Sequence, residues 1–192
     1  MINFNFKEEI YKIIFLKYKY FKIYTHLTNE EKLKLFNLAI NSRKGSVIVE
    51  VGSYLGASSN FLAKAAKIRS SKLHCIDTWQ NHEMSEGIRD TFEEFKKNTI
   101  SLSKYIEIHK GFSAEIAKKF DQEIDMIFFD GGHSYETINS DWNNWSPKLK
   151  KNAIVVFHDT GWAEGVNKVI EENSSSLSKK DSLPNMWWGT KI

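Results

Sequence analysis

Cysteine is almost absent from this chain, and long hydrophobic runs are missing altogether. Cys75 is the only cysteine among 192 residues, which excludes an intrachain disulfide and a zinc site built from several cysteines. It lies in the apolar run 73–76, where we interpret it as a buried, unreactive thiol. No run of about 18 apolar residues is present, and Lys7, Glu8 and Glu9 interrupt any signal-peptide core. We therefore expect a protein of the reducing cytoplasm without a membrane span.

An excess of charge of one sign is missing too. Lys and Arg number 27 against 24 Asp and Glu, a formal net charge of +3, and no dense basic stripe stands out. Nucleic acid is therefore not an expected partner. What the chain does contain is 41% hydrophobic residues, with 14% aromatic ones, which is typical of a globular domain with its own core.

Residues 1–44 are expected to form a helical segment packed on the core of a domain over 45–192. Residues 6–24, rich in Lys, Tyr, Phe and Ile, predict one helix whose aromatic side chains pack on the main body. Contact with a membrane surface or a partner is the alternative for this basic aromatic face. Thr28 and Glu31 form a capping-box pattern, which predicts that the next helix begins there.

After Gly45 short strands alternate with helices. Strands are expected over residues 47–51, 72–76, 106–109, 125–129, 153–157 and 186–192. Helices are expected over 58–67, 88–98, 114–120, 135–145 and 164–172. Ile88, Phe92 and Phe95 are in helical register, whereas 174–184 has the composition of a polar loop. This order predicts a Rossmann-like, doubly wound α/β fold with a mostly parallel sheet of six or seven strands, and the uniformly apolar strand 125–129 at its centre.

The first predicted strand leads into the loop Gly-Ser-Tyr-Leu-Gly, residues 52–56. Ligands of parallel sheets bind beyond the carboxyl ends of the strands, and Gly52 allows a tight turn close to a ligand, while Gly56 allows close packing where the helix begins. A dinucleotide site normally has one more glycine in between, and Glu50 would repel a phosphate but attract a cation. S-adenosylmethionine carries a sulfonium and an ammonium and no phosphate, so the loop suits it better. Asp77 ends the second strand, where its carboxylate can accept both ribose hydroxyls.

The stretch 48–59 resembles the first motif of class I methyltransferases. Within that class it is similar to the catechol O-methyltransferase branch and to the family of macrolide-sugar O-methyltransferases and cephalosporin hydroxylase relatives. The segments 111–115 and 130–135 and the pair at 158–159 match later motifs, and the match runs from about residue 27 to 168. The resemblance implies that S-adenosylmethionine contacts the following residues: Glu50, Gly52, Ser53, Tyr54 and Ser58 at the methionine end, Asp77 at the ribose, Ser113 near the adenine, and Asp130.

Two carboxylates follow two successive apolar strands. Asp130 comes directly after the predicted central strand, and His158 and Asp159 end the next one. If these strands are neighbours, their ends lie about 4.8 Å apart, which is close enough for one divalent cation to bridge Asp130 and Asp159. Successive strand residues point to opposite faces, so His158 joins this metal site only if the chain is already turning, as Gly161 would allow.

The identity of the ion and of the base follows from the residue types. The macrolide-sugar enzymes that the chain resembles have acidic residues at all three ligand positions. Histidine at 158 therefore either stays outside the ion's ligands or favours a manganese-like ion over magnesium. His133 is the candidate general base, with a turn histidine that bonds backbone as the alternative. Trp79 is a candidate for the adenine or acceptor pocket, and three further histidines are interpreted as incidental: His74, His82 and His109.

These residues together predict metal-assisted O-methylation of a small molecule, a sugar or a small phenol. No segment resembles a substrate-capping insertion. The acceptor site is therefore expected to come from the N-terminal segment, from residues 80–87, or from a second subunit of a homo-oligomer. Two alternatives stay open: another Rossmann-like nucleotide-dependent enzyme, such as a hydroxylase or oxidoreductase, and a non-catalytic methyltransferase-like binding module.

Overall fold

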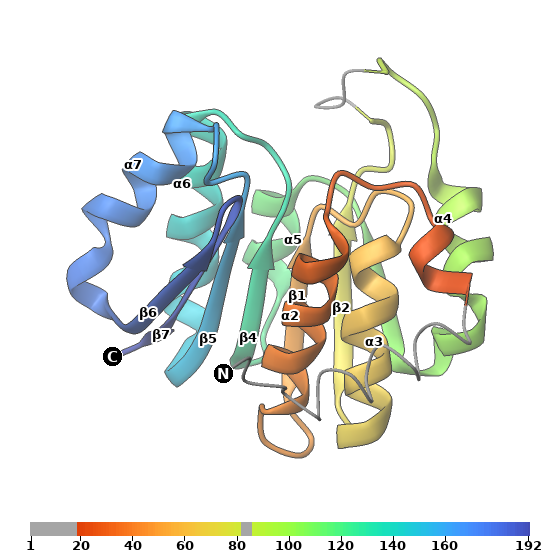
Figure 1. Ribbon diagram of the computed structural model, residues 1–192, viewed down its shortest axis with the longest axis horizontal. Helices are drawn as coiled ribbons and strands as arrows, with labels where there is room; N and C mark the ends of the chain where they lie inside the picture. The colour runs from red at the N-terminus through yellow and green to blue at the C-terminus, as the bar shows by residue number, and fades with distance from the viewer. Residues whose placement is uncertain (1–18, 82–85) are drawn as a thin grey trace, which may run out of the picture.

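The computed structural model describes residues 19–81 and 86–192 (Figure 1). The helix expected over 6–24 lies largely outside the described residues, and its described end, η1 (Lys19–Lys22), is a 3₁₀ turn. Helix α2 (Asn29–Ile40) begins where the capping box predicted. The Thr28 hydroxyl accepts a hydrogen bond from the Glu31 N–H (3.2 Å), and the Glu31 carboxylate accepts one from the Thr28 N–H (2.7 Å). Two of the helix's unpaired donors are thereby satisfied.

The described residues form one seven-stranded sheet in the order β3-β2-β1-β4-β5-β7-β6. Strands β1 to β5 are parallel, and β7 runs antiparallel to both β5 and β6. The strands are β1 (Val47–Val51), β2 (Lys72–Asp77), β3 (Ile106–Lys110), β4 (Ile124–Phe129), β5 (Leu149–His158), β6 (Leu177–Leu183) and β7 (Met186–Lys191). The predicted mostly parallel, doubly wound α/β fold is confirmed. Strand β4, buried at every residue, lies between β1 and β5, as its apolar sequence predicted.

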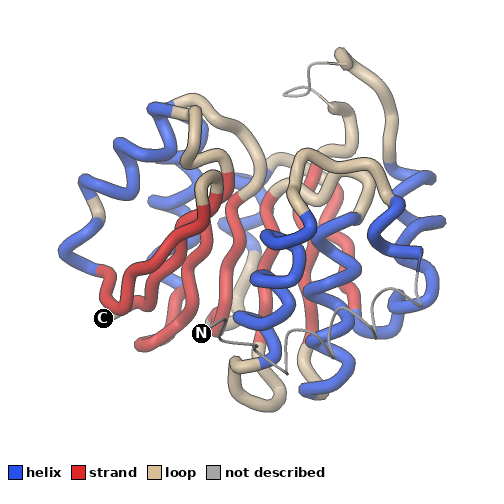
Figure 2. Tube along the Cα trace, in the orientation of Figure 1, coloured by secondary structure: helices blue, strands red, loops and turns tan. Residues whose placement is uncertain are grey.

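Helices cover both faces of this sheet, so the molecule has three layers (Figure 2). One core joins the sheet to α2, α3 (Ala57–Arg69) and α4 (Phe92–Thr99). The other core joins it to α5 (Ser113–Lys119), α6 (Tyr135–Trp145) and α7 (Glu164–Glu172). Short 3₁₀ segments complete the described chain: η2 (Ile100–Tyr105), η3 (Ser146–Lys148) and η4 (Ser174–Ser176). None of the helices in these described ranges is long and apolar enough to cross a membrane.

The polar loop expected over 174–184 is wrong, because this stretch contains β6. Strand β6 pairs only with β7, so it forms an edge of the sheet, and among its residues only Leu177 is buried. Lys179 and Lys180 are exposed, and lysine is a common residue on edge strands, where its charge opposes pairing with other chains. The strand escaped detection because an edge strand with solvent around it carries little apolar signal.

The helix expected over 88–98 begins later than predicted, at Phe92. Ile88 is 76% exposed and lies outside it. The Asp90 side chain accepts a hydrogen bond from the Phe92 N–H (2.9 Å), and the Thr91 N–H donates to the Trp79 carbonyl (3.0 Å). The chain before Phe92 is thus tied to the loop after β2, and this tertiary contact overrides the helical spacing of Ile88.

Candidate functional site

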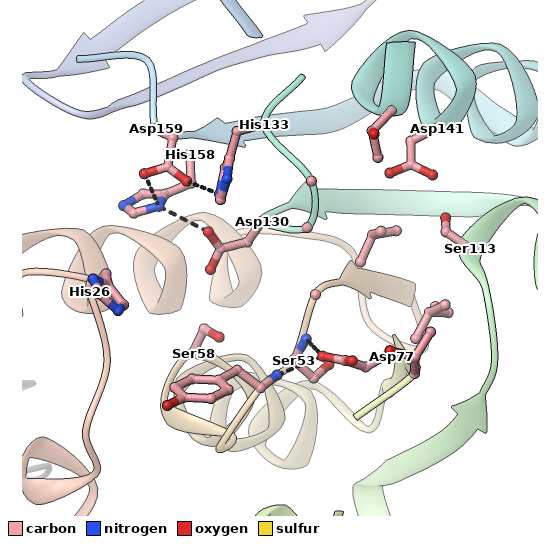
Figure 3. Close-up of a pocket in the computed structure, with 18 of the residues that line it drawn as sticks. His26, Ser53, Ser58, Asp77, Ser113, Asp130, His133, Asp141, His158 and Asp159 are labelled. Carbon is pink, nitrogen blue, oxygen red and sulfur yellow. Dashed lines mark hydrogen bonds and ion pairs between the residues drawn. The ribbon is translucent and has the colours of Figure 1, made fainter. Parts of the chain in front are cut away.

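The carboxyl ends of β1, β2, β4 and β5 open into one cavity of about 820 Å³. Strand β1 lies between β2 and β4, so the strand order changes direction next to β1. Open α/β sheets bind their ligands at such a point. Most of the predicted site residues line this cavity: Gly52, Ser53, Tyr54, Ser58, Asp77, Ser113, Asp130, His133, His158 and Asp159 (Figure 3). Among the predicted catalytic, cofactor and metal residues, Glu50 alone lies outside the lining.

The loop after β1 needs its two glycines for packing. Gly52 has φ +87°, and a Cβ there would lie 2.1 Å from the backbone oxygen of Asp130, so the group it approaches is the loop after β4. Gly56 has φ +82°, and its Cβ would lie 2.7 Å from the Thr99 side chain. Both positions have a left-handed conformation that other residues adopt at a cost. The close packing expected at Gly56 is therefore present, against α4.

Glu50 lies beneath this loop. Its Oε2 accepts hydrogen bonds from the Ser53 hydroxyl (2.7 Å), the Ser59 hydroxyl and the Cys75 thiol (3.4 Å). Burial raises the pKa of the Glu50 carboxyl to about 6, and no described residue bonds its buried Oε1. Glu50 therefore ties the end of β1 to the loop through Ser53 and to the first turn of α3 through Ser59. Cys75 is buried, as the sequence predicted, and burial raises the pKa of its thiol.

Asp77 organises the same loop from the side. One carboxylate oxygen accepts the backbone N–H groups of Ser53 and Tyr54, each at 2.8 Å, and the other accepts the Trp79 N–H at 2.6 Å. A carboxylate offers about four acceptor sites, so about one remains for a ligand. Trp79 itself lies outside the cavity lining and is fully buried between Phe92 and Phe95, so its expected place in the pocket is wrong.

The residues after β4 and β5 meet in one cluster, the acidic cluster, made of Asp130, His133, His158 and Asp159. The His158 Nδ1 lies 2.9 Å from the Asp130 Oδ1 and 3.3 Å from the Asp159 Oδ1. The His133 Nε2 lies 2.8 Å from the Asp159 Oδ2. Asp159 has φ +62°, so the chain turns at this residue and brings His158 and Asp159 to the same site. The question left open by the sequence, whether both could reach one site, is thereby answered.

Three side chains that sequence reasoning missed complete the cluster. The Trp162 Nε1–H donates to the Asp159 Oδ1 (2.8 Å), and Asn185 donates to the same oxygen (3.3 Å). The Glu31 Oε1 lies 3.5 Å from the His158 Nε2. Glu31 has the sequence signature of a helix cap only, and Trp162 and Asn185 lie in loops with no local pattern. Only the fold brings them together.

Charge in the acidic cluster is arranged around the buried His158. Burial alone would lower the pKa of His158, but the facing carboxylates of Asp130, Asp159 and Glu31 outweigh it and raise the pKa to about 12. Burial would raise the pKa of Asp159, yet hydrogen bonds from His133 and His158 lower it well below its usual range. Burial raises the pKa of Asp130. Three carboxyl groups thus face one imidazole, and this end of the cavity suits a positively charged ligand.

The N-terminal segment forms another wall of the cavity. Residues 25–27 and Asn81 line it, and they belong to the N-terminal segment and to residues 80–87, whose role in an acceptor site stays a prediction. Tyr24, 57% exposed, has its ring 5.6 Å from that of His26 and 6.4 Å from that of Tyr54. On the other side Trp162, 61% exposed, lies with its ring 4.9 Å from His133. Two aromatic side chains, Tyr54 and Trp162, therefore line the cavity, and Tyr24 packs on Tyr54.

Two of the histidines that were interpreted as incidental lie outside the cavity lining. His74 Nδ1 and His109 Nε2 are 3.0 Å apart, and their rings pack against Phe120. His82 lies outside the described residues.

At the far end of the cavity the Ser113 hydroxyl accepts a hydrogen bond from the Trp145 Nε1–H (2.8 Å). Asp141 of α6, which the sequence reasoning overlooked, lines the cavity beside it.

Comparisons with known proteins agree with this geometry. The model of a family described as "Methyltransferase domain" matches residues 49–160 of the 192. The uncharacterized protein y4gI of Sinorhizobium fredii (strain NGR234) is 26% identical over 76% of this chain, but the match spans only 17% of that protein. The chain therefore covers less than a fifth of the length of this relative.

Solved structures show the same fold. The O-methyltransferase NovP has a TM-score of 0.70 and 13% identity, over 88% of this chain and 82% of its own. TomG from Streptomyces achromogenes, an O-methyltransferase solved with S-adenosylmethionine, has a TM-score of 0.68 and 18% identity, over 86% and 81%. A putative caffeoyl-CoA O-methyltransferase from Staphylococcus aureus has 0.66 and 14%, over 93% and 91%. With the family match covering more than half of its length, the chain belongs to the methyltransferase domain family.

Proposed function

We propose that the protein transfers the methyl group of S-adenosylmethionine to a hydroxyl of a small acceptor, a sugar or a phenol. In this proposal Asp130, His158 and Asp159 hold a divalent cation and His133 is the general base. The observation that carries it is the ion pair of His133 with Asp159, inside an acidic cluster at the carboxyl ends of β4 and β5. A base, its orienting carboxylate and ligand atoms for a cation are thereby brought to one cavity.

The cavity residues fit S-adenosylmethionine. When bound, it supplies a methyl group already activated by a sulfonium. The acidic cluster favours that positive charge, and the loop of Gly52, Ser53 and Tyr54 with Ser58 presents polar groups to the methionine end. Asp77 keeps about one acceptor site for the ribose. The S-adenosylmethionine bound to the similar TomG supports the same choice.

The acidic cluster also fits a divalent cation. Adjacent ligand atoms around an octahedral ion with bonds of about 2.1 Å lie about 3.0 Å apart. The His158 Nδ1 lies 2.9 and 3.3 Å from the two carboxylate oxygens, which matches that spacing, and a cation bound there would take the place of the proton that this ion pair holds on Nδ1. When bound, such an ion lowers the pKa of an acceptor hydroxyl. One imidazole among carboxylates favours a manganese-like ion over magnesium, which prefers oxygen alone.

His133 is oriented for proton transfer. The Asp159 Oδ2 accepts the hydrogen bond from the His133 Nε2, which assigns the proton of the neutral ring to Nε2 and leaves the lone pair on Nδ1. Trp162 packs beside the ring and also bonds Asp159, so base and carboxylate share one support. His133 would accept the proton of the acceptor hydroxyl as its oxygen takes the methyl group, while the bond from that methyl group to the sulfonium breaks and leaves a neutral thioether. The aromatic side chains Tyr54 and Trp162 that line the cavity suit a flat phenol or the apolar face of a sugar.

A methyl-transfer assay tests this proposal. Protein treated with chelator is given S-adenosylmethionine labelled in its methyl group and a panel of sugars and phenols, with no ion, Mg²⁺ or Mn²⁺ added back. We expect a labelled methyl ether, loss of at least about tenfold in rate without an ion, and better recovery with Mn²⁺ than with Mg²⁺. Full activity in chelator would remove the cation from the proposal.

Binding measurements separate the alternatives. Calorimetry with S-adenosylhomocysteine and with NAD is done on the same preparation. Binding of NAD but not of S-adenosylhomocysteine would replace the proposal with another Rossmann-like nucleotide-dependent enzyme. Binding of S-adenosylhomocysteine without transfer to any acceptor tried would favour a non-catalytic binding module.

A further inference from the structure

Asp141 is a carboxylic acid on the buried face of a helix. The buried residues of α6 are Ile138, Asp141, Trp142 and Trp145, which form one stripe at helical spacing. Asp141 is only 4% exposed, yet it lines the cavity. It lies beside Gly131, since a Cβ built on that glycine would be 4.0 Å from the Asp141 Oδ2. Because Gly131 has no side chain, space is left in front of the carboxyl group.

The neighbours of Asp141 supply few donors. The Trp145 Nε1–H donates to the Ser113 oxygen at 2.8 Å, and the Ser113 hydroxyl in turn bonds the Asp141 carboxyl. The single O–H of Ser113 is used in this relay, so Asp141 is its final acceptor. In the part of the chain that the structure describes, no Lys, Arg or His forms an ion pair with Asp141.

A buried carboxyl group with one hydrogen-bond donor is expensive unless further donors reach it. Burial disfavours the ionised carboxylate and thereby raises the pKa of Asp141 to about 6. A carboxylate has about four acceptor sites, and Ser113 uses one of them. Since the carboxyl group faces the cavity, the missing donor belongs to the ligand.

The position along the cavity identifies that donor. In Figure 3 Ser113 and Asp141 lie across the loop of Ser53 and Asp77 from His26, away from the end where His26 and the acidic cluster lie. With the sulfonium near the acidic cluster and the ribose at Asp77, the base of the cofactor reaches Asp141. Adenine carries an exocyclic amine with two N–H donors.

We infer that Asp141 selects the adenine of the cofactor by accepting a hydrogen bond from its exocyclic amine. This rests on the proposed function, since it requires the cavity to bind S-adenosylmethionine. It replaces the expected contact of Ser113 with adenine, because the hydroxyl of Ser113 is occupied by Asp141 and Trp145. A base with a carbonyl in place of the amine would turn an oxygen lone pair toward the carboxylate, and the buried acceptor would lose its partner.

The test compares two ligands that differ only in this group, S-adenosylhomocysteine and S-inosylhomocysteine, by calorimetry. We expect wild-type protein to prefer the adenosyl ligand by about a hundredfold or more, a value typical of a site that loses a buried hydrogen bond. Asp141→Asn offers an N–H to the inosine carbonyl, so the preference should fall at least about tenfold, mainly through tighter binding of the inosyl ligand. Glu115→Gln, an exposed carboxylate of α5 outside the cavity lining, is the matched control and should keep the wild-type ratio.

The outcomes of this calorimetry decide whether Asp141 selects the adenine. Equal affinity of wild-type protein for the two ligands overturns the inference without any variant, which matters if Asp141→Asn does not fold. A strong wild-type preference that persists in folded Asp141→Asn assigns selection to other groups and also overturns it. In both cases S-adenosylhomocysteine still binds, so the proposed function survives. Failure of wild-type protein to bind S-adenosylhomocysteine at all overturns both.

Discussion

The conformation of a single residue, Asp159, brings the acidic cluster together. In a regular strand His158 and Asp159 would point to opposite faces, but the left-handed conformation of Asp159 (φ +62°) turns the chain and directs both to Asp130. One carboxylate oxygen of Asp159 then pairs with His133, and the other accepts hydrogen bonds from Trp162 and Asn185. The sequence predicted the members of this cluster from the ends of the strands, and Gly161 allowed a turn nearby, but the sequence did not show that Asp159 itself takes the left-handed conformation.

The substitution His133→Ala tests the proposed general base, a single residue. Removal of a general base typically lowers the chemical step by about 10² to 10⁴-fold. We expect a loss of that size in single-turnover methyl transfer, with the affinity for S-adenosylhomocysteine changed little. His109→Ala is the control, since this imidazole lies outside the cavity lining. A wild-type rate in His133→Ala would leave an enzyme that works by alignment alone.

At the scale of elements, the core strands, the edge strand β3 and the strand-end loops could be predicted, whereas the other edge strand, β6, and the start of α4 could not. Helices cover both faces of strands β1 and β4, so these strands are mostly apolar, and their apolar runs are visible in the sequence. Strand β6 is polar because it is an edge, and the helical spacing of Ile88 is overridden by a backbone tie to the loop after β2. Asp141 did leave a signal, a charge on the apolar stripe of α6, but Glu31, Trp162 and Asn185 join the site only through the fold.

The contact between the loops after β1 and β4 can be tested with two glycines of similar conformation. A Cβ added at Gly45 (φ +72°) would meet nothing within 4 Å, whereas one added at Gly52 (φ +87°) would lie 2.1 Å from the Asp130 oxygen. Gly45→Ala should lower the free energy of unfolding by about 1–2 kcal/mol, the cost of the left-handed conformation. Gly52→Ala adds an overlap worth about a further 1–3 kcal/mol and should weaken S-adenosylhomocysteine binding. Urea unfolding and calorimetry measure both, and equal losses in the two variants would show that the loops do not press on each other.

At the scale of the whole molecule, the stability of the fold depends on pH through Glu50. Burial raises the pKa of this carboxyl to about 6 in the folded state, above its ordinary 4.5. The unfolded chain therefore loses this proton first, so the contribution of Glu50 is fully present below about pH 4.5 and is lost as the pH rises through about 6. The difference of about 1.5 pKa units corresponds to about 2 kcal/mol.

Glu50→Gln isolates this effect because its side chain does not titrate. The free energy of unfolding of wild type minus that of Glu50→Gln should fall by about 2 kcal/mol between about pH 4.5 and pH 7. Chemical denaturation at several pH values measures it. Glu171→Gln, at an exposed carboxylate of α7, should show no such change. A difference between wild type and Glu50→Gln that is constant with pH would mean that the folded protein keeps Glu50 ionised.

The loop after β1 and the loop that carries Asp130 pack directly on each other. Besides the contact at Gly52, the Asp130 N–H donates to the Val51 carbonyl at 2.8 Å. If the cofactor and a cation bind as proposed, a shift of one loop on binding moves the other, so we expect the two ligands to be energetically coupled. Such coupling is reciprocal: the factor by which the cofactor changes the affinity for a cation equals the factor by which the cation changes the affinity for the cofactor. The order in which the enzyme is loaded then has no effect on the final complex, only on the path to it.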